Sequence, residues 1–146
     1  MSPRENEVGR TKDAGWQIGV SRTVAHPVER VWDLLTCDEG TALWLGSGVT
    51  VDPQTGQGYE TEEGTVGETR SHRFQDRIRL TWQPENWDHE TTVQVAVVPN
   101  GPDRTMIRFH QERLANAEER ERQRTHWRGV MDAVTAALDP RDAPDG

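Results

Sequence analysis

The stretch 116–138, NAEERERQRTHWRGVMDAVTAAL, decides the fold because it predicts the longest helix of the chain. Asn116 suits the N-cap position, and Glu119 stands three residues later, as in a capping box with Asn in place of Ser or Thr. Pro140 cannot continue a helix, so we expect the helix to end at about Leu138. No other predicted element is long enough to cover a sheet.

The two halves of this helix differ in character. Residues 118–124 carry no apolar residue, so we expect the first half to face solvent. The second half carries one apolar stripe, which predicts packing against a sheet and consists of Trp127, Val130, Met131, Val134 and Leu138.

Upstream of the helix, alternating residues predict the sheet that it covers. Residues 16–25 alternate as a half-buried strand does. From Gly46 onward, short alternating runs are separated by turn sequences such as residues 99–102. Short strands joined by tight turns predict an antiparallel meander. Its apolar sets are Ile78, Leu80 and Trp82, then Val93, Val95 and Val97, then Ile107 and Phe109.

Two short helices are predicted between the first strand and the meander. Pro27 suits a first helical turn, and apolar residues follow at helical spacing, which predicts a helix over about 27–36. Asp38 is expected to cap a second helix through Leu45. The predicted class is therefore α+β, a curved antiparallel sheet of about six or seven strands with two short helices and one long C-terminal helix. Such an arrangement leaves room for a cavity between sheet and helices, where ligands commonly bind.

The 146 residues fit a single domain, which we place at 15–138. Residues 1–14 and 139–146 are polar and are expected to be disordered. The only cysteine, Cys37, cannot build a disulfide framework or a zinc site. Without a secretory signal or an apolar run of membrane-spanning length, a cytoplasmic location is expected. The net charge of −8 argues against a nucleic-acid partner.

Several short motifs follow one another in an order that is typical of one superfamily. Residues 22–32, RTVAHPVERVW, are similar to its first strand end and Pro-led helix, with His26 replacing one residue of the usual small-plus-Pro pair. Trp44 matches a tryptophan of its second short helix. Further matches follow at residues 64–68, 79–82, 91–93, 104–110 and 110–114. Residues 127–130 depart from the usual Gly-Trp order. Residues 16–138 thus resemble the START-like (SRPBCC) superfamily, and within it the AHSA-type branch, similar to the C-terminal domain of the activator of the large heat-shock chaperone ATPase.

This resemblance implies the helix-grip fold, as in birch-pollen allergen proteins, often with an apolar cavity. It carries no catalytic signature, and functions in the superfamily range from lipid and polyketide binding to cyclisation, hydrolysis and co-chaperone activity. The sequence shows no metal-binding motif, because none of the five histidines forms a ligand pair. It also lacks the Gly-x-Ser-x-Gly motif of a catalytic serine, and no cofactor site is predicted.

Two groups of residues are candidates for a ligand site. Val66, Glu68, Arg70 and His72 share one face of a predicted strand. This face is either a charged, solvent-facing surface or, as the family match of Val66 implies, a cavity wall that would bring an acid and a base together. The apolar cavity candidates are Trp44, Trp82, Phe109, Trp127 and Met131.

Three functions remain open from the sequence. The leading hypothesis is a non-enzymatic module that binds an apolar or amphipathic small molecule. The first alternative is an enzyme like a polyketide cyclase or hydrolase, which would use Glu68, Arg70 and His72. The second alternative is a co-chaperone-like regulator of a chaperone ATPase. A homodimer or another protein partner also remains open, and no cofactor is expected.

Overall fold

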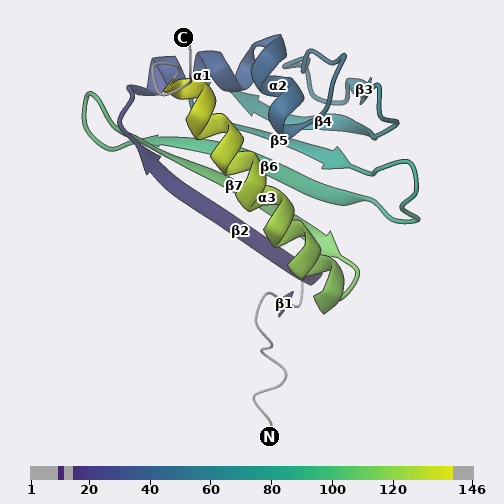
Figure 1. Cartoon of the computed structure of the whole chain (residues 1–146). Coiled ribbons are helices and arrows are strands. Elements are labelled where there is room, and N and C mark those ends of the chain that lie inside the picture. Colours follow the sequence, from purple (N-terminus) through teal and green to yellow (C-terminus); the bar gives the residue numbers. More distant parts are fainter. Residues whose placement is uncertain (1–9, 12–14, 140–146) are drawn as a thin grey trace, which may run out of the picture.

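A curved antiparallel sheet, crossed on one face by a long helix, forms the body of the protein (Figure 1). The computed structural model describes residues 10, 11 and 15–139. The strands β1 to β7 are Arg10–Thr11, Gly15–Val24, Gly58–Glu60, Val66–Arg73, Arg77–Trp82, Thr91–Pro99 and Thr105–Leu114. They form one seven-stranded sheet in the order β1-β2-β7-β6-β5-β4-β3, with antiparallel neighbours throughout. The predicted α+β helix-grip class is confirmed.

The helices of the described residues are α1 (Val28–Thr36), α2 (Asp38–Trp44) and α3 (Ala117–Leu138). In Figure 1, α1 and α2 lie together beside the C-terminal end of α3. Asn116 caps α3 as predicted, because its side-chain oxygen accepts from the Glu119 N–H at 2.8 Å. The cap of α2 is Cys37 in place of the predicted Asp38, and Cys37 Sγ accepts from the Gly40 N–H at 3.4 Å.

The face of the sheet that α3 covers is apolar. Alternation along β5, β6 and β7 turns every second side chain toward α3. On α3 itself, Trp127, Met131 and Val134 are fully buried. The strand residues of this inner face are 0 to 1% exposed: Ile78, Leu80, Val93, Val95, Val97, Ile107 and Phe109. These seven residues are all members of the apolar sets predicted from the alternation. The remaining member, Trp82, is 7% exposed.

The first half of α3 differs from the prediction. Glu119 and Gln123 are 6% and 7% exposed, whereas the sequence predicts a solvated segment. Both side chains lie on the same helix face as Trp127, because the three residues stand four apart. Burial is tolerated since each has hydrogen-bonding partners on neighbouring elements. A polar stripe therefore continues the apolar stripe toward the start of the helix.

The predicted domain bounds fall partly outside the described residues. Arg10 and Thr11 stand in a segment predicted to be disordered, but they pair with Trp16 and Gly15 at the edge of the sheet. The rest of both segments lies outside the described residues, at 1–9, 12–14 and 140–146. Within the described ranges, no helix is long and apolar enough to cross a membrane.

Candidate functional site

Four aromatic side chains meet where the connection between β5 and β6 approaches α3. Trp82 ends β5, Trp87 lies in the connection, and two neighbours on α3, His126 and Trp127, complete the group. The ring of Trp82 lies 5.4 Å from that of Trp87 and 6.1 Å from that of His126, centroid to centroid. His126 and Trp127 meet edge to face at 4.8 Å. These four residues are termed the aromatic cluster.

Trp82 is distinguished by its hydrogen bonding. The residue is 7% exposed, and its indole Nε1 is buried without a hydrogen-bond partner among the described residues. Trp44 differs because its indole N–H donates to the Leu35 carbonyl at 2.8 Å. A buried donor without an acceptor costs about 1–3 kcal/mol. The aromatic cluster therefore contains one polar group that an added acceptor would satisfy.

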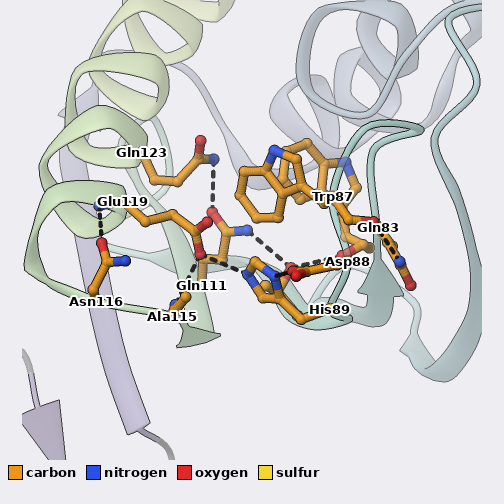
Figure 2. A network of polar contacts seen from close by, with 11 residues as sticks. Gln83, Trp87, Asp88, His89, Gln111, Ala115, Asn116, Glu119 and Gln123 are labelled. Carbon is orange, nitrogen blue, oxygen red and sulfur yellow. Dashed lines mark hydrogen bonds and ion pairs between the residues drawn. The ribbon is translucent and has the colours of Figure 1, made fainter.

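A buried polar network joins α3 to the inner face of the sheet (Figure 2). Gln111 on β7 is fully buried, and its Oε1 accepts from Gln123 Nε2 at 2.9 Å and from Trp127 Nε1 at 2.8 Å. Its Nε2 donates to Thr91 Oγ1 at 2.9 Å. The Thr91 hydroxyl in turn donates to the Trp82 carbonyl at 2.7 Å. The network thus fixes the two tryptophans relative to one another.

A second set of contacts ties the β5–β6 connection to the start of α3 (Figure 2). His89 stacks on Trp87 with ring centroids 5.0 Å apart. His89 Nε2 lies 2.7 Å from Glu119 Oε1, and His89 Nδ1 lies 2.9 Å from Asp88 Oδ1. Glu119 Oε1 also accepts from the Ala115 N–H at 2.8 Å. These contacts hold Trp87 in place as one wall of the aromatic cluster.

The two histidines of this region have opposite pKa shifts. Burial is the largest single influence on His89 and lowers its pKa, but the hydrogen bonds and charges of Asp88 and Glu119 together raise the pKa. Burial lowers the pKa of His126. The His126 residue is exposed overall, yet its ring packs against the neighbouring indoles, which shield the ring from water. At neutral pH the His126 ring is uncharged and has both a donor and an acceptor nitrogen.

The apolar side chains predicted to line a cavity meet, but they are packed as core. Phe109, Trp127 and Met131 are each 0% exposed, and Phe109 stacks on Trp127 with centroids 5.0 Å apart. Trp82 adjoins this group, 6.4 Å from Trp127. These side chains belong to the hydrophobic core. A surface hollow of about 590 Å³ lies between β2 and the first turns of α3 and is lined by none of them.

Trp44 lies apart from the aromatic cluster. It is 2% exposed on α2, and its bond to the Leu35 carbonyl fastens α2 to α1. Its contribution is therefore to the packing of the two short helices.

Strand β4 places its predicted site residues on different faces. Val66 is 43% exposed, and the side chains of Glu68 and Arg70 are 40% and 50% exposed and form an ion pair at 3.0 Å. A β-bulge at Arg70 shifts the register, so His72 turns to the inner side and meets Trp32 with centroids 5.7 Å apart. Of the two readings that the sequence leaves open for this face, the charged, solvent-facing one fits Val66, Glu68 and Arg70. Glu68, Arg70 and His72 do not converge, so the alternative acid–base wall lacks its third member.

Several residues of the site carry no motif that marks them in the sequence. Trp87 and His89 lie in a connection, where no periodicity predicts the direction of a side chain. Glu119 and Gln123 do carry a signal, since they stand eight and four residues before Trp127 on one helix face. In the part of the chain that the structure describes, no group of three or more His, Cys, Asp or Glu side chains is arranged to hold a metal ion.

A family model accounts for most of the chain. The model described as Activator of Hsp90 ATPase homolog 1-like protein matches residues 25–139. The chain belongs to this AHSA1-like family. The predicted AHSA-type, START-like assignment is thereby confirmed. No curated protein matches the chain.

Solved structures share the AHSA1-like fold at low sequence identity. PFC0360w, an HSP90 activator from Plasmodium falciparum, is 17% identical with a TM-score of 0.71, over 84% of this chain and 96% of that one. DynU16, from the dynemicin biosynthetic locus, is 18% identical with a TM-score of 0.70, over 84% of this chain and 47% of that one. An Aha1 dimer from Colwellia psychrerythraea is 15% identical with a TM-score of 0.68, over 87% of this chain and 98% of that one. At such identities the likeness shows the fold alone.

Proposed function

We propose that this AHSA1-like domain is a binding module that takes an amphipathic small molecule at the aromatic cluster. The observation that carries the proposal is the Trp82 indole N–H, a buried donor without an acceptor beside two other aromatic rings. A ligand with a flat apolar body and one polar oxygen complements this arrangement. Its body would contact the rings, and its oxygen would accept from Trp82 Nε1.

Such a ligand would enter past the outer rings of the aromatic cluster. Trp87 is half-buried and His126 is exposed, whereas Trp82 and Trp127 are buried behind them. The lowered pKa of His126 keeps its ring neutral near pH 7, so the rim favours an uncharged ligand. Aromatic walls with few polar groups are common in small-molecule sites.

The buried network leaves Trp82 as the main source of hydrogen-bonding specificity. Gln111 already accepts two hydrogen bonds and donates one, all to protein groups. Trp127 is likewise engaged through its indole N–H. Of these three side chains, only Trp82 has a nitrogen that makes no hydrogen bond to the described residues.

Binding is favoured over catalysis for two reasons. The acid–base set proposed for a cyclase or hydrolase does not converge, because Glu68 and Arg70 are exposed on the opposite face from His72. DynU16, a relative in fold, is described as part of a biosynthetic locus, which supports a small-molecule ligand.

Nile red is a suitable probe, because it is neutral and planar and carries a carbonyl oxygen. We expect its fluorescence to rise saturably on titration with the full chain. Trp82→Phe keeps an aromatic ring but removes the N–H, so we expect the affinity to fall about fivefold, as for the loss of one hydrogen bond of about 1 kcal/mol. Trp87→Ala removes one wall and should weaken binding further.

Phe74→Ala is the matched control, since Phe74 is 75% exposed and packs near Trp32, away from the aromatic cluster. It should leave Nile red binding unchanged. Equal affinity of the parent and Trp82→Phe would contradict the proposed contact. Equal losses in Phe74→Ala and Trp87→Ala would contradict the proposed location.

Protein association is a second candidate function, supported by the descriptions of two relatives as an HSP90 activator and an Aha1 dimer. The 75% exposed ring of Phe74 is a large apolar group that an interface would cover. Light scattering on the full chain tests homodimerisation, and a monomer mass at the highest soluble concentration would exclude it. A chaperone ATPase assay without stimulation would exclude a co-chaperone role.

A further inference from the structure

The face of the sheet opposite α3 carries a row of arginines. Cross-strand pairing places four residues of β4, β5, β6 and β7 side by side, in the order Arg73, Arg77, Ala96 and Arg108. Ile78, which follows Arg77, is fully buried on the inner face, so the row points outward. Arg73, Arg77 and Arg108 are termed the arginine row.

The arginine row has no acidic partner within the described residues. No carboxylate oxygen lies within 4.0 Å of its guanidinium nitrogens. Other arginines of this face are paired: Arg70 lies 3.0 Å from Glu68. Arg79 lies 3.2 Å from Glu112. In addition, Arg77 Nε is buried and has no hydrogen-bond partner among the described residues.

The arrangement is unfavourable without a bound anion. Arg73 and Arg77 are direct cross-strand partners, and like charges in such positions destabilise a sheet. Three strand spacings separate Arg73 from Arg108, so the row spans about 14 Å. An occupant with several carboxylates would turn this repulsion into attraction, because a guanidinium group binds a carboxylate through paired N–H donors.

Apolar groups border the arginine row. A hollow of about 360 Å³ opens beside it, and Ala96, Val98, Met106 and Arg108 contribute to its lining. Val98 is 46% exposed. The absence of a side chain at Gly19 leaves room for the Arg108 guanidinium group, since a Cβ built at Gly19 would lie 3.3 Å from Arg108 Nη2. The surface therefore combines cationic groups with a small depression whose lining is partly apolar and partly polar, with Glu112 on its wall.

We propose that the arginine row is a docking surface for an acidic peptide segment of another protein, with apolar residues between its carboxylates. The carboxylates would pair with the guanidinium groups, and an apolar side chain would enter the hollow at Ala96 and Val98. A long polyanion is disfavoured, because the chain carries a net charge of −8 and would repel it beyond the row. An extended peptide of about five residues spans the row. This surface is separate from the aromatic cluster, and its test does not depend on the ligand there.

Calorimetric titration of the full chain with a synthetic peptide of about nine residues that alternates Glu and Leu tests the proposal. We expect saturable binding that weakens as salt is added. The double variant Arg73→Gln/Arg108→Gln should bind at least about tenfold more weakly. Arg122→Gln, at an exposed position of α3, is the control and should bind like the parent. A peptide with Gln in place of Glu should not bind.

Equal binding by the parent and the double variant would overturn the proposal, as would equal binding of the Gln peptide. A single-stranded oligonucleotide that binds more tightly than the Glu–Leu peptide through the same arginines would also overturn it. A second measurement is independent of any peptide. Arg73→Gln should raise the urea midpoint at low salt and change it little at high salt, because it relieves repulsion from Arg77. A lowered midpoint at both salt concentrations would contradict the unpaired state of the row.

Discussion

His89 Nε2 lies 2.7 Å from Glu119 Oε1, and this contact joins the β5–β6 connection to the first turn of α3. Glu119 is 6% exposed and also accepts from the Ala115 N–H, so its carboxylate is held from two sides. The ring of His89 in turn supports Trp87 by stacking. The stability of the fold and the shape of the aromatic cluster are therefore coupled through one ion pair.

His89→Gln should destabilise the protein more in acid than in base. Burial lowers the pKa of His89, but Asp88 and Glu119 together raise it above its ordinary value. The folded state thus holds the proton more tightly, and its contribution is fully present below about pH 6.5 and is lost as pH rises through the folded-state pKa. We expect a deficit of about 1 kcal/mol at about pH 5.5 and a smaller one at about pH 8.5.

Urea unfolding of the parent and His89→Gln at both pH values measures this difference. The subtraction removes the contributions of His110 and His126, whose pKa values are lowered chiefly by burial. A deficit that grows with pH, or that is the same at both values, would contradict the protonated His89–Glu119 pair.

Gln111→Leu should be strongly destabilising, by about 3 kcal/mol, because it leaves two buried donors without their acceptor. These donors are the Gln123 amide and the Trp127 indole N–H, and the Thr91 hydroxyl loses one of its two hydrogen bonds. Adding Gln123→Leu removes one of the orphaned groups, so the double variant should lose less than the sum of the single variants. Denaturant unfolding of all four proteins completes the cycle, and strict additivity would contradict the network.

The same substitution at two tryptophans should have different costs. Trp44→Phe removes the hydrogen bond to the Leu35 carbonyl, whereas Trp82→Phe removes an N–H that has no partner among the described residues. Both changes lose a similar volume from a buried site, so the difference isolates the hydrogen bond. We expect Trp44→Phe to cost about 1 kcal/mol more in free energy of unfolding. Equal costs would show that Trp82 Nε1 is bonded in solution.

Two helical glycines should respond to alanine in opposite directions. A Cβ at Gly40 would lie 1.6 Å from the Leu34 carbonyl oxygen, whereas a Cβ at Gly129 would meet nothing within 4 Å. Gly40→Ala should therefore destabilise by about 2 kcal/mol or more. Gly129→Ala should stabilise by about 0.8–1 kcal/mol through helix propensity. Thermal unfolding checks the pair, and a stable Gly40→Ala protein would contradict the close packing of α1 on α2.

The sequence predicts the order of elements well because most of its signals are local. Asn116 caps α3, and the alternation of β5, β6 and β7 defines the inner face. The faces of β4 are less predictable, because the bulge at Arg70 inserts one residue into the alternation. Glu68 and His72 consequently point to opposite sides although their spacing is even. A bulge depends on pairing with a distant strand, which periodicity does not contain.

The candidate site is less predictable than the fold for a similar reason. The sequence identifies Trp82 and Trp127 as members of predicted apolar sets. The burial of Glu119, in contrast, depends on a contact with His89, thirty residues earlier in the chain. Charged residues are rarely buried without such partners, so composition alone favours a solvated first half of α3. Phe109 stacks on Trp127 within the hydrophobic core, a contact that equally suits a cavity wall when only the sequence is known.

The most direct test of the central claim is an amide-and-indole NMR spectrum of the full chain during titration with Nile red. The six tryptophans give six indole N–H signals, which Trp82→Phe and Trp44→Phe assign by loss of a peak. The proposal predicts a saturable shift of the Trp82 signal as the dye's oxygen becomes its acceptor, with the Trp44 signal unchanged. A Trp82 signal that stays in place while the dye binds, or the absence of any dye binding, would contradict a ligand site at the aromatic cluster.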